Sequence, residues 1–269
     1  MVHMGVREAR MLEVIATVLG VTMLIMAMLW VRSLWTLNVT VVDVFFGPAF
    51  TLQAGIAAVL HGGVSPRGIC LLICVALWSL RLAVHLGGRS AGAPEDSRYA
   101  AMRTARAEGF ALWSLCGVFG LQALIITFVA MPLTVGLTWG LEGDWTALDA
   151  VGFAVCLGGL GFETLADRQL VAFRSESANH GKVLDTGLWR YTRHPNYFGE
   201  FCFWWGACLI ALVGGAPSWT AAGPVLLTFL LLRVSGVRLM EETITGRRRE
   251  YVEYIARTSA FVPWFPRGG

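Results

Sequence analysis

The sequence contains few charged residues. Only 14% of its 269 residues are Asp, Glu, Lys or Arg, and 56% are hydrophobic, whereas a soluble domain carries about 25% charged residues. Lysine is nearly missing, since Lys182 is the only one and the other basic residues are arginines. This composition excludes a separate soluble domain and predicts a single membrane domain over residues 1–269.

Several common motifs are also missing. The six cysteines lie in apolar runs without a CxxC pair, so we interpret them as small buried residues and expect no metal site. No Gly-x-Gly-x-x-Gly follows a strand, so a Rossmann site is not indicated. The apolar stretch 11–31 is longer than the roughly 7–15 residues of a signal-peptide core, which predicts a retained first helix.

Long hydrophobic runs are present instead. About 20 apolar residues cross a bilayer, and lipid requires backbone polar groups to be satisfied within the protein, so these runs predict an all-α bundle of about seven transmembrane helices. The predicted spans are 11–31, 38–60, 68–87, 110–139, 146–166, 197–213 and 219–240. The fourth run is long, and we expect either that Pro132 kinks it or that its end lies in the membrane interface.

The basic residues are divided unequally between the predicted loops. The N-terminus and the loops on its side hold three of them, and the opposite loops and the C-terminal tail hold sixteen. Positive charge concentrates on the cytosolic side of membrane proteins. The sequence therefore predicts an N-terminus outside and a C-terminus in the cytosol.

The densest polar segment, 185–200, leads into the sixth predicted span. Pro195 suits the first turn of a helix, and Asn196 and Glu200 are four residues apart on one face of that helix. Basic residues beside a helix N-terminus favour an anion. An interfacial belt of Arg, Trp and Tyr is the alternative interpretation, but it does not require Asn and Glu within the span.

The segment Gly-Leu-Trp-Arg-Tyr-Thr-Arg-His-Pro-Asn-Tyr-Phe-Gly-Glu, residues 187–200, resembles the signature of the steroid 5α-reductase-like membrane proteins, above all their bacterial branch. Segments around 166–174 and 233–266 resemble the same branch. The likeness is strong over 163–266 and weak before it. Sterol reductases and isoprenylcysteine methyltransferases share the Arg-His-Pro-x-Tyr core, so the motif indicates a superfamily more specifically than a reaction.

In these reductases the C-terminal half binds NADPH, so the resemblance implies that residues 141–269 form a cofactor pocket. The residues that would line it are Arg168, Arg174, Trp189, Arg193, His194, Asn196, Tyr197, Glu200, Arg233, Ser235, Glu241, Tyr251 and Tyr254. The chemistry is consistent, because Arg174 and Arg193 can bind phosphates bidentately. Arg233 has a second interpretation, in which it extends to the cytosolic interface.

The helices of residues 1–140 are expected to form the cavity for a lipophilic substrate. Asp43 lies in the second predicted span, where a carboxylate indicates function by default. Trp78, Arg81 and His85 share a face of the third span, and Arg81 is a candidate counter-ion of Asp43. A structural Asp–Arg pair is the alternative.

In the steroid reductases a Glu and a Tyr on these two spans polarise the ketone. Asp43 would replace that Glu, but Trp78 occupies the place of the Tyr. Because an indole cannot serve as an acid, Asp43 would supply the proton, with the help of His85 as a replacement for the Tyr or through water. The segment 95–99, Glu-Asp-Ser-Arg-Tyr, either closes over the cofactor or forms a solvated loop with local ion pairs.

The resemblance implies an NADPH-dependent oxidoreductase that reduces a C=C bond conjugated to a ketone, with a 3-oxo-Δ4-steroid as the model substrate. Asp43, His85 and Arg81 would form its catalytic group. The alternatives are an S-adenosylmethionine-dependent methyltransferase and a non-enzymatic lipid-binding or scaffold protein. The expected partners are a steroid-like enone and membrane lipids, without nucleic acid or an obligate protein partner, and the expected location is a bacterial inner membrane.

Overall fold

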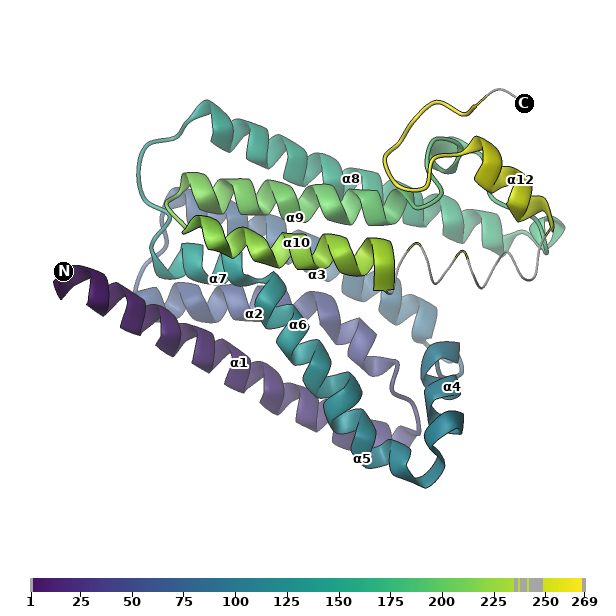
Figure 1. The fold of residues 1–269 in the computed structure, drawn as a ribbon, viewed down its shortest axis with the longest axis horizontal. Coiled ribbons are helices and arrows are strands. Elements are labelled where there is room, and N and C mark those ends of the chain that lie inside the picture. The colour runs from purple at the N-terminus through teal and green to yellow at the C-terminus, as the bar shows by residue number, and fades with distance from the viewer. Residues whose placement is uncertain (1, 235–236, 238–240, 242–248, 268–269) are drawn as a thin grey trace. The chain divides into compact units, whose positions relative to one another are not determined.

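A computed structural model of the chain describes residues 2–234, 237, 241 and 249–267, and this part of the chain is helical without strands (Figure 1). The chain divides into two compact units. Unit 1 comprises Met1–Thr146 and Ile210–Gly223, and unit 2 comprises Ala147–Leu209 and Pro224–Gly269. The all-α class predicted from the sequence is therefore confirmed for the described residues.

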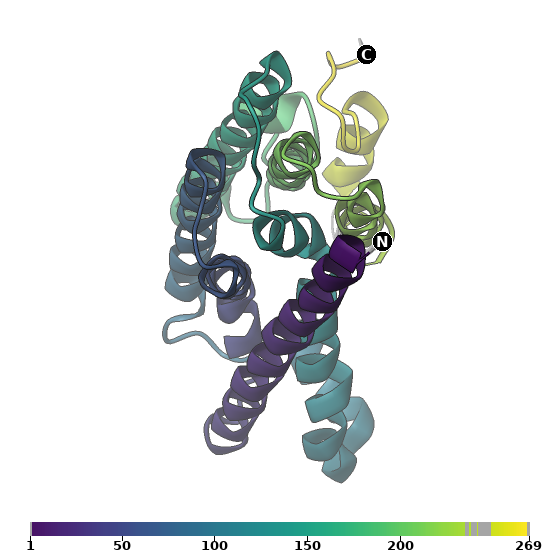
Figure 2. The same cartoon turned by 90° about the vertical axis from the view of Figure 1, so that its left-hand side faces the viewer.

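Unit 1 contains most of the long N-terminal helices. They are α1 (Val2–Thr36), α2 (Val41–His61), α3 (Pro66–Ser90), α4 (Ser97–Arg106), η1 (Ala107–Gly109), α5 (Phe110–Ser114), the π-helical η2 (Leu115–Gly120), α6 (Leu121–Val129), α7 (Met131–Thr138) and η5 (Ser218–Ala221). The segments α4 to α6 follow one another almost without interruption, and α1 packs along η2 and α6 (Figure 2).

The α2–α3 hairpin is set by local signals at its turn. Helix α2 ends at Gly62, whose φ of 88° suits glycine. Helix α3 begins after Ser65, whose hydroxyl accepts a hydrogen bond from the Gly68 N–H at 3.1 Å. The two helices approach closely at Gly47, where a Cβ would lie 2.9 Å from the Ser79 carbonyl oxygen.

A buried polar cluster connects three helices of unit 1. The Gln53 amide on α2 donates hydrogen bonds to Thr22 on α1 and to Thr127 on α6, each at 2.9 Å. Gln53 is fully buried. Side-chain hydrogen bonds of this kind join helices within a membrane, where burial between apolar helices provides little driving force.

Unit 2 contains α8 (Ala147–Ser175), η3 (Ser177–Asn179), η4 (Gly187–Arg190), most of α9 (Pro195–Val213), most of α10 (Ala222–Phe229), the π-helical η6 (Leu230–Val234) and α12 (Arg249–Arg257). Helices α8 and α9 lie side by side (Figure 1). A Cβ at Gly159 would lie 2.5 Å from the Phe203 nitrogen, and one at Gly199 would lie 2.6 Å from the Glu163 nitrogen. Glycine thus allows the two backbones to touch.

Within the part of the chain that the structure describes, six helices are long and apolar enough to cross a membrane: Arg7–Thr36, Val41–His61, Pro66–Ser90, Ser97–Val129, Ala147–Ser175 and Pro195–Val213. The seventh predicted span corresponds to the shorter apolar helix Ser218–Val234. The fourth predicted run is interrupted at Ala130, and Pro132 lies in the first turn of α7. The orientation of the termini stays a prediction.

Candidate functional site

The carboxylate of Asp43 lies in the first turn of α2 and has two partners on α4. The Tyr99 hydroxyl donates a hydrogen bond to Asp43 Oδ1 at 2.6 Å, and Arg98 Nη2 forms an ion pair with Oδ2 at 2.7 Å. Tyr99 is 5% exposed. A short bond between a buried phenol and a carboxylate is a configuration in which a proton can be shared or transferred.

The segment before α4 is fastened to the start of α2. Glu95 accepts hydrogen bonds from the Val39 N–H at 2.8 Å and from Arg103. Asp96 caps α4 by accepting from the Arg98 N–H at 3.0 Å. Burial raises the pKa of both carboxyl groups, but hydrogen bonds from the arginines outweigh it, so both pKa values are lowered.

The segment 95–99 thus contains local ion pairs, as one of its two sequence interpretations held. It also brings Tyr99 to Asp43, a contact that was not predicted from the sequence. The two residues are 56 positions apart, and neither helical periodicity nor motif spacing relates them. The sequence does contain one signal that could have indicated this contact. Tyr99 lies in the first turn of α4, shortly after the acidic residues Glu95 and Asp96.

Of the α3 residues, Arg81 and His85 lie near the level of Asp43 in the α2–α3 hairpin, and Trp78 lies deeper. Trp78 is fully buried and packs edge-on against Phe50 at 5.7 Å between ring centroids, so it is a core aromatic side chain. Arg81 and His85 are half-buried. In the antiparallel hairpin Gly47 faces Ser79 and Gly87 lies beside Val44, so His85 is near the level of Asp43 and Arg81 lies about 3 Å, or half a turn, deeper. The counter-ion described for Asp43 is Arg98.

Arg193 forms the centre of the charged cluster in unit 2. Its guanidinium bonds both oxygens of Glu241, with Nε–Oε1 at 2.7 Å and Nη2–Oε2 at 3.1 Å. Its Nη1 donates to the backbone carbonyls of Ile255 and Thr258. Arg193 is only 8% exposed. The guanidinium therefore holds the C-terminal segment in place, and phosphate binding by Arg193 would require an exchange of partners.

Glu241 also accepts a hydrogen bond from His194, whose Nε2 lies 3.2 Å from Oε1. The His194 ring stacks on Tyr197 with 5.5 Å between centroids. Burial raises the pKa of Glu241, but the hydrogen bonds and positive charge of His194 and Arg193 outweigh it and lower this pKa to about 2. Glu241 is therefore ionised throughout the physiological range.

The rest of the signature segment is fixed to α8 and to the C-terminal tail. Trp189 Nε1 donates to the Ala166 carbonyl at 3.1 Å, and the Tyr254 hydroxyl donates to the Trp189 carbonyl. Tyr254 packs against Tyr251, and both are buried. These three aromatic residues of the proposed pocket thus support the segment that precedes α9.

The other proposed cofactor residues are less enclosed. Asn196 and Glu200 are half-buried one turn apart in α9, as predicted, while Arg168, Arg174 and Arg233 are exposed. Ser235 lies outside the described residues. Amide, carboxylate and guanidinium groups are the donors and acceptors that a ribose, a carboxamide and phosphates require, so the chemistry of this set fits a dinucleotide.

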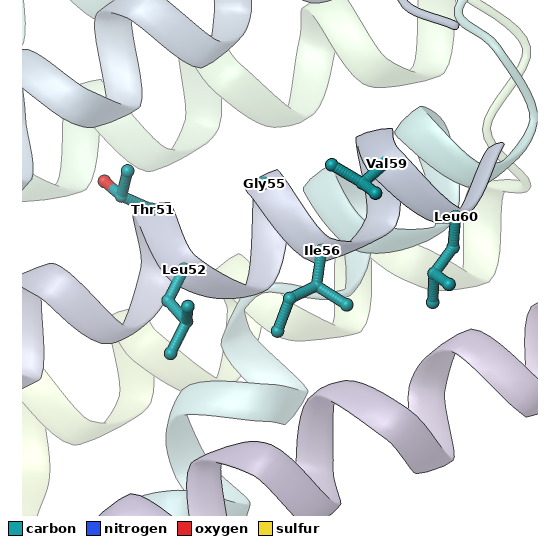
Figure 3. Close-up of a pocket in the computed structure, with 6 residues that line it drawn as sticks. All are labelled: Thr51, Leu52, Gly55, Ile56, Val59 and Leu60. Atoms are coloured by element: carbon teal, nitrogen blue, oxygen red, sulfur yellow. The ribbon is translucent and has the colours of Figure 1, made fainter. Parts of the chain in front are cut away.

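An apolar groove of about 430 Å³ lies along α2 beside Thr51, Leu52, Gly55, Ile56, Val59 and Leu60 (Figure 3). Thr51 lies about 12 Å along the helix from Asp43 at 1.5 Å per residue. At 100° per residue, Leu52 lies about 180° around the helix from Asp43. The groove and the Asp43–Tyr99 pair therefore do not form one site.

Unit 2 contains buried acidic residues that the sequence analysis passed over. Asp149, Glu163 and Asp167 lie in α8, and each is at least nine-tenths buried. A carboxyl group within a span is expensive unless it has a partner. This rule identified Asp43 and applies equally to Glu163, which lies within the fifth predicted span.

The described residues contain six helices that are long and apolar enough to cross a membrane, which indicates an integral membrane protein. A family profile described as "Protein of unknown function (DUF1295)" matches residues 29–258, so the chain belongs to this family. It is 27% identical over 225 residues to an uncharacterized protein of Schizosaccharomyces pombe. The match covers 71% of this chain and 63% of that protein, so the chain spans less than two thirds of that relative's length. No solved structure matches the chain.

Proposed function

We propose that this protein reduces a C=C bond conjugated to a ketone in a lipophilic substrate, such as a 3-oxo-Δ4-steroid, with NADPH as the reductant. The observation that carries the proposal is the 2.6 Å hydrogen bond between Tyr99 and Asp43. The signature of residues 187–200 and the association of the family with steroid 5α-reductase-like proteins support it. Tyr99 takes the place of Asp43 and His85 as the proposed proton donor.

When bound, NADPH supplies the hydride that adds to the β-carbon of the enone. The protein must then stabilise the negative charge on the ketone oxygen and deliver one proton. Tyr99 turns its hydroxyl from the ionised Asp43 to that oxygen and donates its phenolic proton there, and the resulting phenolate takes a proton from solvent. These two proton transfers leave Tyr99 unchanged, and the saturated ketone forms when the enol tautomerises. Arg98 stabilises charge on the Asp43–Tyr99 pair.

The proposed roles differ between the residues. Asp43, Tyr99 and Arg98 would act on the ketone. Asn196 and Glu200 would bind the ribose or carboxamide, and Arg168 and Arg174 would bind the phosphates. Because Arg193 is saturated by Glu241 and backbone carbonyls, its proposed role is to shape the pocket. Transfer of hydride requires positioning of the reactants more than a protein nucleophile.

The test compares Tyr99→Phe with wild-type protein in detergent. NADPH oxidation is followed by absorbance with a panel of enones, and NADPH binding is followed by its fluorescence. Loss of a general acid lowers turnover about 10²–10⁴-fold, so we expect Tyr99→Phe to lose kcat at least a hundredfold and to keep NADPH affinity. Tyr191→Phe, which removes an exposed hydroxyl from unit 2, is the control.

Two results would contradict the proposal. Full turnover by Tyr99→Phe would remove Tyr99 from the reaction. Thermal stabilisation of the wild-type protein by S-adenosylmethionine, with none by NADPH, would favour the methyltransferase instead.

A further inference from the structure

A second groove, of about 680 Å³, lies entirely within unit 2 and is polar. Asp185 and Arg190 line it from the segment before α9, Arg257 from the end of α12, and Phe265 and Arg267 from the C-terminal tail. Arg190, Arg257 and Arg267 are not among the proposed cofactor residues. Three guanidinium groups around one groove indicate an anion site.

The walls of this groove are held by backbone hydrogen bonds. The Trp264 N–H donates to the Tyr191 carbonyl, and the Arg267 N–H donates to the Arg257 carbonyl, each at 2.9 Å. The Phe265 ring lies edge-on to Tyr191 with 6.0 Å between centroids. The tail is therefore docked on both sides of the groove, and the arginines project from fixed backbone.

The charges in the groove do not cancel. Arg257 forms an ion pair with Asp185. Within the described part of the chain, the side chains of Arg190 and Arg267 make no hydrogen bond or ion pair. Three arginines and one aspartate leave two positive charges, which matches a phosphate monoester of about −1.5 to −2 at pH 7.

Apolar side chains at the groove are exposed: Phe265 lines it, and Trp264 precedes Phe265 in the chain. Trp264 is 70% exposed and Phe265 is 75% exposed. The groove residues 185–190 closely precede α9, which is long and apolar enough to span the membrane. Aromatic residues at the end of a span lie at the level of the lipid headgroups. The ligand that suits this combination carries a phosphate next to a hydrophobic part.

We propose that this groove binds the phosphate headgroup of an anionic phospholipid, with Arg190, Arg257 and Arg267 around the phosphate and Trp264 and Phe265 against the lipid. A free phosphate has the same anionic chemistry but does not use the exposed aromatic side chains. A phosphate of NADPH has it too, and NADPH is therefore one arm of the test. The proposal is independent of the reductase activity, since none of these residues belongs to the proposed reaction.

The experiment uses the full-length protein in neutral detergent. Wild type, Arg190→Gln/Arg267→Gln and the charge-matched control Arg32→Gln are titrated separately with phosphatidic acid, phosphatidylcholine, inorganic phosphate and NADPH. Bound lipid is counted by native mass spectrometry, and stabilisation is followed by melting temperature. The double variant removes only exposed side chains, so its melting temperature without ligand should equal that of wild type.

We expect wild type and Arg32→Gln to bind phosphatidic acid in preference to phosphatidylcholine. The double glutamine variant should lose at least about tenfold in its affinity for phosphatidic acid, because hydrogen bonds to charged groups are stronger than those between neutral groups. Arg190→Lys/Arg267→Lys keeps the charge and should lose less. Equal binding by wild type and the double glutamine variant would overturn the proposal. Inorganic phosphate or NADPH that binds as tightly as phosphatidic acid, with the same loss in the variant, would overturn the lipid assignment.

Discussion

The Asp43 cluster of unit 1 and the Arg193 cluster of unit 2 both pair an arginine with a carboxylate, but the two pairs differ in enclosure. The Arg98 side chain is 41% exposed, and Asp43 also accepts from a phenol. The Arg193 side chain is 9% exposed, and it bonds Glu241 and two backbone carbonyls. The comparison shows that Arg193, which belongs to the signature segment, holds the C-terminal segment in place. Tyr99 lies outside that segment, and its hydroxyl donates a short hydrogen bond to a carboxylate.

Removal of Arg193 should have the largest effect on stability. Arg193→Gln removes one donor of Glu241 and the side-chain donor of the Ile255 and Thr258 carbonyls, and breaking a buried pair from one side costs about 3–5 kcal/mol. Equilibrium unfolding in mixed detergent micelles measures this loss. Arg190→Gln, three residues earlier and exposed, is the matched control and should change the free energy of unfolding by less than about 0.5 kcal/mol. An equal effect of both substitutions would contradict the structural role.

The second-largest effect is expected from acid, which should weaken the Arg193 cluster. The pKa of Glu241 is about 2, below its ordinary value of 4.5. Because the pKa is lower in the folded state, the ionised carboxylate stabilises the fold fully above about pH 4.5, and this contribution is lost as the pH falls towards 2. We expect the melting temperature to fall in this window.

Glu241→Gln provides the control for this pH dependence. It should be less stable than wild type at neutral pH and should lose less stability between pH 4.5 and 2, since it has no carboxyl group at this position to protonate. If the melting temperatures of the two proteins fell by the same amount between pH 4.5 and 2, other groups would dominate the acid response.

Removal of Arg98 should have the smallest effect on stability. Arg98→Gln breaks a partly exposed ion pair, and such pairs contribute about 0–1 kcal/mol. The same unfolding measurement, with the same Arg-to-Gln change as at Arg193, isolates the effect of burial. A loss as large as that of Arg193→Gln would show that the Asp43 cluster is also a structural clamp, and would weaken its assignment as the acid of the reaction.

Predictions from the sequence were accurate where the signal is local. Pro195 does begin α9, and Pro132 does follow an interruption of the fourth run, because proline lacks an N–H and is tolerated in a first turn. The number of spans was less secure. Six helices reach membrane-spanning length, while Ser218–Val234 is shorter, because hydropathy alone does not show where a helix ends.

The sequence by itself determined the helical membrane class, since long apolar runs in lipid have few other ways to satisfy their backbone. It also determined the shared face of Asn196 and Glu200, which follows from helix geometry. Only the tertiary structure decided the partners of the charged groups. Arg193 and Glu241 are 48 residues apart, and Asp43 and Tyr99 are 56 apart. Contacts at such separations depend on how helices pack, and neither periodicity nor motif spacing encodes that packing.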